Sequence, residues 1–285
     1  MSGAQSPTVR RRRLGHELRQ LREAAGLRID EVAQRLEVSS AAISRIETGG
    51  VGVRVRDVSD LLDQYGIQGT DRANLLTLTR EARQPAWWRS RSYGDVLSEG
   101  LDVWIGLETE AVAIRTFEVQ LVPGLFQTRE YARTVLGAYY GSEPSEQIER
   151  RVELRMARQQ LVIEQNDTPI SAVLDESVLR RHIGPAELMQ SQYRQLLQLS
   201  EKSNITIQVL PFDAGVYTIP GGFTMMQLPY DPEVVVIEHR GGTLCMEKPQ
   251  EVAMHDQVFA HLKATAKGPE ESLSYIYHLA KLKAE

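Results

Sequence analysis

The feature of this sequence that most constrains its fold is a series of short amphipathic patterns near the start of the chain. In the first, Leu14, Leu18 and Leu21 recur at intervals of three or four residues, which places them on one face of a helix. Gly26 follows, and glycine commonly ends a helix because it adopts a positive φ without strain. The pattern predicts a short helix that stops at Gly26.

Four further patterns of the same kind follow. The second runs from Ile29 to Leu36, the third begins at the serines of EVSSAAISRIETGG (37–50) and stops at Gly49, and the last two cover about 54–65 and 70–83. Five short helices in succession predict a compact all-α domain over residues 9–83. Residues 1–8 are small and polar and lack a period, which predicts a disordered start.

A change of composition marks the end of this domain. In ARQPAWWRSRSYGD (82–95), Pro85 cannot continue a helix, and arginines and serines follow it. We therefore expect a linker over residues 84–98. Trp87 and Trp88 within it are expected to pack the two domains together, with the stacking of a ligand as the alternative.

The remainder of the chain mixes two periodicities. Helical patterns cover about 99–116, 128–140, 144–165, 176–181, 185–200, 249–267 and 270–284, and strand-like runs are ISAVL (170–174), ITIQVL (205–210), FTMMQL (223–228), VVVIEH (234–239) and TLCME (243–247). The last two runs flank RGG, which predicts a hairpin. We expect an α+β domain with a mainly antiparallel sheet over residues 99–285, which dimerises the protein and receives a signal.

The composition limits where in the cell the protein is expected and which kinds of site it can contain. A single cysteine, Cys245, excludes an internal disulfide framework and a multi-thiolate metal site. No apolar segment follows the basic start, and the longest aliphatic run is VVVI (234–237), so we expect neither a secreted nor a membrane protein. A cytoplasmic, nucleoid-associated protein is expected.

The charge is unevenly distributed along the chain. Residues 1–91 hold 16 Lys/Arg against 11 Asp/Glu, a net +5, whereas residues 92–285 hold 17 against 27, a net −10. Seven of the arginines lie within residues 1–28. A basic first domain predicts contact with phosphate groups.

The third helical pattern carries one polar stripe. The residues that its core does not need are Ser40, Ala41, Ser44, Arg45 and Thr48. All are small except Arg45, so the helix backbone can approach a surface while one long side chain reaches forward, as a recognition helix in the major groove requires. We expect Ser40, Ala41, Ser44 and Arg45 to contact bases.

These residues resemble a known family. LRQLREAAGLRIDEVAQRLEVSSAAISRIETG is similar to the helix-turn-helix domain of phage-repressor and Cro-like (xenobiotic response element) regulators from about residue 14 to residue 66. The resemblance implies binding to double-stranded DNA, and a structural clamp between Arg22 and Glu47. A helical adaptor that binds protein is the alternative for this domain.

Phosphate contacts are expected around the recognition helix. The family has a serine or threonine and then a glutamine where this chain has Arg28 and Ile29, and Arg28 is expected to replace the glutamine contact. The predicted phosphate-binding residues are Arg11, Arg12, Arg28, Ser39, Thr48 and Arg54. Ser39 also suits the N-cap of the helix.

The second domain bears a resemblance of its own. WW (87–88), VPGLFQTREYAR (122–133), RRVELRMARQQ (150–160), AVLDESVLRR (172–181) and QVLPFDAG (208–215) look like the C-terminal domain of a group of actinobacterial regulators. The resemblance implies a transcription regulator that is often encoded beside a small partner protein. It implies no ligand and no reaction.

Candidate ligand or partner residues can be named. Phe126 lies in the VPGLFQT segment and Tyr131 in the predicted helix after it. These residues either line a ligand or partner pocket or fill the core of their own domain. A ligand cavity would add Trp104 and Tyr217, the latter in PFDAGVYTIPGG (211–222), which is either a lid or a connector. Arg151, Arg155 and Arg158 share one helix face, which is either solvated and ion-paired or the site of an anion or acidic partner.

The sequence favours a regulator over an enzyme. No nucleophile motif, clustered metal ligands or Gly-rich phosphate loop is present, so no catalytic residue, metal or cofactor is expected. A two-fold dimer would bind a palindromic operator with half-sites about 10 bp apart. The signal would be a small molecule or, in an antitoxin-like alternative, a small partner protein encoded next to the regulator.

Overall fold

The structure is a computed structural model that describes residues 7–83, 86–89, 93–97, 100–217, 221–229, 233–239 and 242–282. Contacts divide the chain into two compact units, Met1–Ser90 and Arg91–Glu285. The division between residues 90 and 91 falls inside the segment 84–98, for which the sequence predicts a linker. Part of this segment, residues 84–85, 90–92 and 98, lies outside the described residues.

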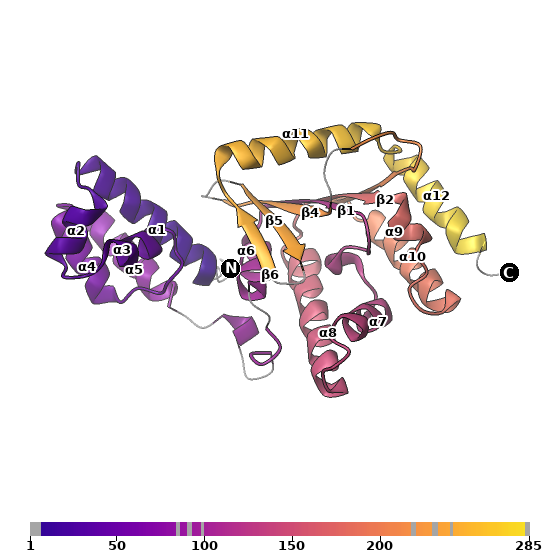
Figure 1. Cartoon of the computed structure of the whole chain (residues 1–285), viewed down its shortest axis with the longest axis horizontal. Helices are drawn as coiled ribbons and strands as arrows, with labels where there is room; N and C mark the ends of the chain where they lie inside the picture. Colours follow the sequence, from indigo (N-terminus) through magenta and orange to yellow (C-terminus); the bar gives the residue numbers. More distant parts are fainter. Residues whose placement is uncertain are drawn as a thin grey trace. The chain divides into compact units, whose positions relative to one another are not determined.

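The first unit is built from five helices, as the sequence predicts (Figure 1). They are α1 (Pro7–Ala24), α2 (Ile29–Arg35), α3 (Ser40–Glu47), α4 (Val55–Gln64) and α5 (Gly69–Glu81). The expectation of a disordered start is wrong for Pro7 and Thr8, which form the first turn of α1. Proline suits a first helical turn because its missing N–H has no partner there. Residues 1–6 lie outside the described residues.

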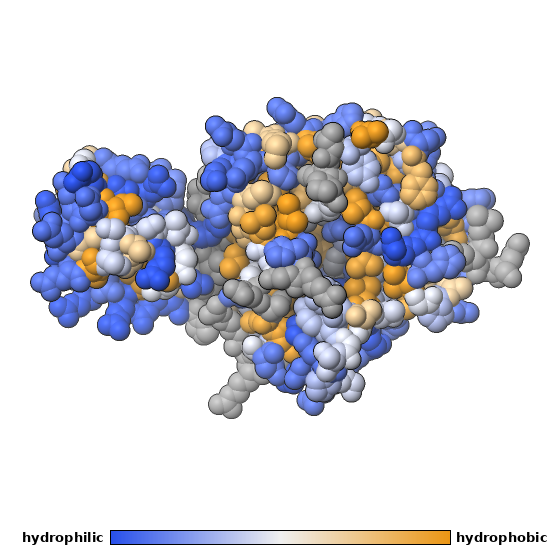
Figure 2. All heavy atoms as spheres, in the orientation of Figure 1, coloured by the Kyte–Doolittle hydropathy of each residue, from blue (hydrophilic) through white to orange (hydrophobic). Residues whose placement is uncertain are grey.

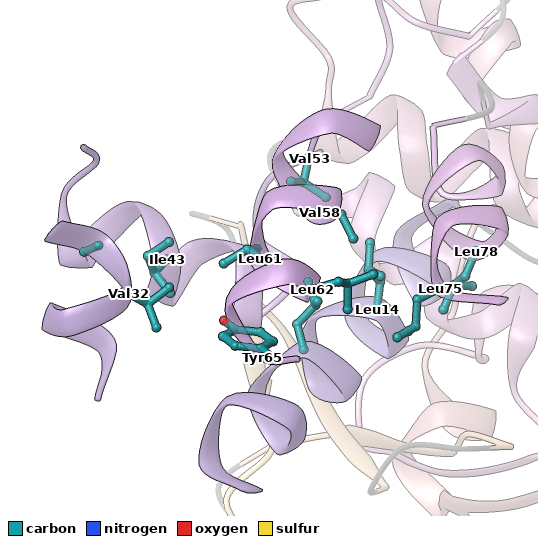
Figure 3. Close-up of a cluster of buried hydrophobic side chains, with 12 residues drawn as sticks. Leu14, Val32, Ile43, Val53, Val58, Leu61, Leu62, Tyr65, Leu75 and Leu78 are labelled. Carbon is teal, nitrogen blue, oxygen red and sulfur yellow. The ribbon is translucent and has the colours of Figure 1, made fainter. Parts of the chain in front are cut away.

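The core of the first unit is aliphatic. Figure 3 shows the side chains of Leu14, Leu62 and Leu75 converging from three helices. Val32 of α2 faces Ile43 of α3 in the same view. Full burial of each such side chain stabilises the fold by about 1.5–3 kcal/mol.

Helices α1 and α3 touch backbone to backbone. A Cβ added to Gly15 of α1 would lie 2.5 Å from the carbonyl oxygens of both Ile46 and Glu47. Gly49, which ends α3 with a φ of +69°, approaches Arg12 of α1 equally closely. The absence of a side chain at residue 15 therefore sets the position of α3.

A single-turn 3₁₀ helix, η1 (Trp87–Arg89), ends the described part of this unit. The rings of Trp87 and Trp88 meet edge to face with centroids 5.6 Å apart, and Trp88 is fully buried. The Trp88 side chain is therefore packed against other residues of the protein and is not exposed to solvent. The predicted role of the pair between the domains stays a prediction.

The second unit combines helices with one sheet of six strands. The helices are α6 (Leu101–Glu110), α7 (Arg129–Tyr139), α8 (Ser145–Gln159), α9 (Glu176–Arg180), α10 (Ala186–Ser200), α11 (Pro249–Thr265) and α12 (Pro269–Leu282), with a 3₁₀ turn η2 (Gly124–Phe126) and a π-helical turn η3 (Gln160–Gln165). The strands are β1 (Ala113–Glu118), β2 (Ile170–Asp175), β3 (Ile205–Leu210), β4 (Phe223–Gln227), β5 (Val234–His239) and β6 (Gly242–Met246). The α+β fold class is confirmed.

The strand order is β3-β2-β1-β4-β5-β6. Strands β1, β2 and β3 are parallel, whereas the pairs β1–β4, β4–β5 and β5–β6 are antiparallel. The sheet is therefore mostly antiparallel but mixed. The β5–β6 hairpin predicted at RGG is present, although residues 240–241 of its turn lie outside the described residues.

One secondary-structure prediction in this unit is wrong. The helical pattern over residues 99–116 ends at Glu110, and residues 113–118 form β1 in the middle of the sheet. Nothing in the sequence between 110 and 113 breaks a helix, and both faces of β1 are covered, so its alternation is weak. The strand forms because β2 and β4 supply its hydrogen-bond partners from distant segments.

The two faces of the sheet carry different layers. Figure 1 shows α11 along one face, with α6, α7 and α8 on the other side of the sheet. On the α11 face, Phe117 and Phe223 pack with Phe259 of α11. On the other face, Ile114, Thr116 and the strands beside them line a cavity. No helix in the described part of the chain is long and apolar enough to cross a membrane.

Candidate nucleic-acid interface and C-terminal cavity

Helix α3 presents the polar stripe that the sequence predicts. The Ser39 hydroxyl caps the helix by accepting a hydrogen bond from the amide of Ala42 at 3.2 Å. The exposed residues of the stripe are Ser40, Ala41, Ser44, Arg45 and Thr48. The Arg45 side chain makes no hydrogen bond or ion pair with any residue that the structure describes. It is available to an external partner.

The opposite face of α3 is fixed by a buried ion pair. Arg22 donates through Nε and Nη2 to the two carboxylate oxygens of Glu47 at 2.6 and 3.0 Å, and through Nη1 to the Leu27 carbonyl at 2.8 Å. The hydrogen bond with Glu47 raises the pKa of Arg22 above its ordinary value. This is the pair that the resemblance implies. Loss of one partner from such a buried pair costs about 3–5 kcal/mol.

The predicted phosphate contacts differ in their availability. Arg54 at the N-cap of α4 is exposed and has no partner among the described residues. Arg28 is 74% exposed but already pairs with Asp30 at 3.0 Å. The Thr48 hydroxyl donates to the Ser44 carbonyl at 2.9 Å. Of these three side chains, Arg54 requires the least rearrangement to reach a phosphate.

Arg11 and Arg12 lie within α1 and are partly buried. Arg12 packs against Gly49 at the end of α3. The pair belongs to a folded helix rather than to a tail that could follow a DNA backbone. Its contact with phosphate stays a prediction.

The second unit encloses a cavity of about 700 Å³ between its sheet and the helices that cover one face. Residues Ile114, Thr116, Thr224 and Val236 form the sheet side. Helices α6, α7 and α8 and the segment 119–127 form the other walls. The volume lies within the range of about 300–1,000 Å³ that small-molecule sites occupy.

The VPGLFQT segment forms one wall and is held rigidly. Gln127 donates to the Val122 carbonyl at 2.7 Å and accepts from Nη1 of Arg155 at 2.6 Å. Gln159 donates to the carbonyls of Gly124 and Gln127 at 2.8 and 2.9 Å. These bonds hold Phe126 buried in the wall, so the segment both closes the core and lines the cavity.

A second wall is built around Glu108 of α6. Arg158 of α8 makes a bidentate pair with the Glu108 carboxylate at 2.8 and 2.9 Å. The indole Nε1 of Trp104 donates to the same carboxylate at 3.1 Å. All three side chains are buried and line the cavity. The charges of this wall are therefore mutually neutralised, and the orientation of the Trp104 ring is fixed.

Two further carboxylates enter the cavity from the sheet. Glu118 ends β1 and Glu238 belongs to β5, and neither makes a hydrogen bond or ion pair with a described residue. Burial, together with the negative charge of Glu238, raises the pKa of Glu118 to about 8. Burial and the neighbouring Arg158 lower the pKa of Arg155 to about 10. At neutral pH, the Glu118 carboxyl is mostly protonated and Arg155 remains a cation.

The structure gathers four of the predicted ligand or partner residues at this cavity and excludes three. Trp104, Phe126, Arg155 and Arg158 line it. Tyr131 is fully buried behind the loop, where its hydroxyl accepts from the Val122 amide at 3.2 Å. The prediction that Tyr131 lines a ligand cavity is wrong because the ring fills the core.

Tyr217 lies on the other face of the sheet. Its ring meets Phe117 with centroids 5.3 Å apart, and its hydroxyl donates to Asp175 at 3.1 Å. Its predicted place in the cavity is therefore wrong. From the same loop, Gly221 and Gly222 do line the cavity, whereas residues 218–220 lie outside the described residues.

The arginine stripe of α8 is not one exposed surface. Arg151 pairs with Glu143 at 2.7 and 2.8 Å and stacks on the Tyr140 ring at 3.7 Å. Its predicted role at an anion or acidic-partner site has no support here, because the side chain is already neutralised. The ion-paired alternative holds for Arg151 and Arg158. Glu149 and Glu153 of the same helix pair with Arg133 and Arg129 of α7.

The sequence reasoning missed the carboxylates of the cavity. Glu108 lies in the segment interpreted as one long helix and Glu238 in a predicted strand, whereas Glu118 lies outside the predicted elements, and none of the three polar side chains gave a motif. The available signal was the alternation of Ile114, Thr116 and Glu118, which places them on one face of a strand.

Comparison with known families agrees with this division. Residues 13–75 match the family described as a helix-turn-helix domain. Residues 101–278, more than half of the chain, match the family described as a domain of unknown function, DUF5753. The chain belongs to the DUF5753 family. No curated protein and no solved structure matched it. In this DUF5753 protein the family domain contains the whole cavity, and the helix-turn-helix match contains α3 and its clamp.

Proposed function

We propose that the protein is a sequence-specific DNA-binding transcription regulator. The observation that carries the proposal is the contrast between the two faces of α3. Glu47 is clamped to Arg22 on the buried face, while Arg45 on the other face is exposed and has no partner among the described residues. A helix held in this way can enter the major groove without moving relative to helix α1. Arg45 then donates to the O6 and N7 atoms of a guanine.

The surface around α3 supports this function. Figure 2 shows hydrophilic residues around the margin of the visible face of the first unit, with apolar and neutral residues in its middle. Arg54 adds an exposed cation with no partner among the described residues at the start of α4, where the helix amides also favour an anion. Residues 1–91 carry a net +5, which adds attraction that does not depend on base sequence.

The second unit is proposed to dimerise the protein and to receive a small-molecule signal in its cavity. The cavity supports the second part of this proposal, because it has the volume of a ligand site and is lined by both apolar and charged groups. The antitoxin-like alternative, control by a small acidic partner, has less support because Arg151 and Arg158 are already paired. We further propose a binding protein of the cytoplasm, associated with the nucleoid, and not an enzyme.

The test is the selection of genomic fragments by the purified full-length protein, followed by sequencing of the retained DNA. We expect enrichment of a two-fold symmetric sequence whose half-sites lie about 10 bp apart, as two copies of α3 on one side of the duplex require. Enrichment of a site without two-fold symmetry would contradict the proposed dimer but would support sequence-specific DNA binding. Retention of all fragments equally would contradict the proposed function itself.

A further inference from the structure

The lining of the cavity indicates what kind of molecule it would take. Apolar groups come from three elements: Trp104 of α6, Leu125 and Phe126 of η2, and Leu136 of α7. Trp104, Leu125 and Leu136 present aromatic and aliphatic surface on the helical side of the cavity, whereas Phe126 is fully buried within this wall. A ligand that fills about 700 Å³ therefore needs an apolar body.

The lining of the cavity holds more carboxyl groups than guanidinium groups. Among the described lining residues, the carboxyl groups are those of Glu108, Glu118 and Glu238, and the guanidinium groups are those of Arg155 and Arg158. The bidentate pair removes Glu108 and Arg158 from the balance. What remains, besides the His239 imidazole, is the Arg155 cation and two carboxyl groups that have no hydrogen bond or ion pair with a described residue. The Glu118 carboxyl is mostly protonated in the empty cavity at neutral pH, and a cation beside it would favour its ionised form.

The remaining cation already has a structural role. Arg155 donates to Gln127 at 2.6 Å and lies against the backbone of Gly124, where an added Cβ would be 3.7 Å from its Nε. It therefore holds the VPGLFQT wall in place. Its Nε has no hydrogen-bond partner, so an anion is the competing ligand chemistry, and the test below includes one.

The Glu118 carboxyl group lies close to the backbone of Gly222. A Cβ added to Gly222 would lie 2.9 Å from the Glu118 carboxylate and 2.8 Å from the Phe117 carbonyl. Residue 222 thus leaves room for the carboxylate by having no side chain. The negative charge of Glu238 disfavours ionisation of Glu118, and a positive charge placed beside the two groups would favour it.

We propose that the cavity binds an organic cation, namely an amine carried on an aromatic or aliphatic body. The amine lies beside Glu118 and Glu238, and the body packs against Trp104 and Leu125. A cation near the Trp104 face also gains from the ring quadrupole. This inference names the signal of the proposed regulator and rests on that function, but the binding step is measured without DNA.

The experiment uses three probes built on naphthalene: naphthylmethylamine, which is an ammonium ion at neutral pH, naphthylmethanol and naphthoate. Each is titrated into the full-length protein by calorimetry. We expect the ammonium probe to bind at least about 10-fold more tightly than the alcohol, and the carboxylate to bind most weakly. Tighter binding of naphthoate would assign the site to Arg155 and overturn the proposal, as would equal binding of the alcohol or no binding of the ammonium probe.

Amino-acid substitutions test whether Glu118 binds the positive charge of the ammonium probe. Glu118→Gln is expected to weaken the ammonium probe about 10-fold and to leave the alcohol within about 2-fold. Glu201→Gln, an exposed change at the end of α10 that does not line the cavity, is the matched control and is expected to change neither affinity. Unchanged ammonium binding in Glu118→Gln overturns the proposal. If that variant does not fold, Glu238→Gln replaces it, with the same selective loss expected.

The fragment selection on the same preparation separates this inference from the proposed function. Probe binding fails while DNA selection succeeds if the ligand assignment alone is wrong. DNA selection fails while probe binding succeeds if the regulatory function alone is wrong.

Discussion

At the scale of single residues, two glutamates that line one cavity behave differently because of their neighbours. Glu108 accepts hydrogen bonds from Arg158 and from the Trp104 indole and belongs to a paired wall. Glu118 meets no counter-charge among the described residues, and the nearby Glu238 makes its ionisation still less favourable. The first carboxylate therefore stabilises the empty protein, whereas the second is stabilised only by what enters the cavity.

The raised pKa of Glu118 predicts a pH dependence of stability. The folded-state pKa of about 8 exceeds the ordinary value of about 4.3, so the folded state holds more protons between these values and stability falls as the pH rises through that window. We expect the melting temperature of the protein to fall more between pH 6 and pH 9 than that of Glu118→Gln, in the absence of ligand. Thermal unfolding of the wild type and of Glu118→Gln at both pH values checks this prediction. Glu201→Gln is the control and is expected to show the same pH dependence as the wild type. Parallel pH profiles would contradict the raised pKa.

At the scale of elements, the approach of α1 to α3 is the contact on which the DNA-reading surface depends. Gly15 makes it possible, since an added Cβ would meet two carbonyl oxygens at 2.5 Å. The clamp between Arg22 and Glu47 joins the same two segments. Anything that separates α1 from α3 therefore also moves Arg45.

We predict that Gly15→Ala destabilises the first unit by about 1–3 kcal/mol, as overpacking of a tight contact does, and weakens DNA binding with it. Gly137→Ala in α7 is the control, because a Cβ there meets nothing within 4 Å and alanine favours the helix by about 0.5–1 kcal/mol. Thermal unfolding and DNA titration of both variants test the prediction. A Gly15→Ala protein as stable as the wild type would show that the two helices do not touch as described.

The elements also show which parts of the fold the sequence could predict. The five helices of the first unit and the β5–β6 hairpin follow from local periodicity and from turn residues such as Gly26 and Gly49. Strand β1 does not, because its pairing with β2 and β4 depends on segments far along the chain. The parallel half of the sheet was missed for the same reason.

At the scale of the whole molecule, the same difference separates the two candidate sites. The α3 surface is local, so the spacing of Ser40, Ser44 and Arg45 sufficed to predict that one face is exposed. The cavity is assembled from segments between residues 104 and 243, and only a tertiary structure brings them together. Sequence reasoning therefore identified Trp104 and Phe126 from their types but placed Tyr131 and Tyr217 beside them wrongly.

The chain joins a proposed DNA-binding domain to a domain proposed to bind a small molecule. We propose above all that α3 reads base sequence through Arg45. An arginine that donates twice to a guanine contributes about 1–3 kcal/mol of discrimination, whereas an arginine on a phosphate contributes equally to every sequence. The two roles can therefore be separated by comparing two duplexes.

The most direct measurement is the affinity of wild type and Arg45→Ala for the selected operator and for a scrambled duplex of equal length, by fluorescence anisotropy at one salt concentration. We predict a loss of about 5- to 150-fold on the operator and a much smaller loss on the scrambled duplex. Arg80→Ala, which removes an exposed arginine of α5, is the matched control and should affect both duplexes slightly and equally. Equal losses on both duplexes for Arg45→Ala would contradict the claim, because Arg45 would then contact phosphate and not bases.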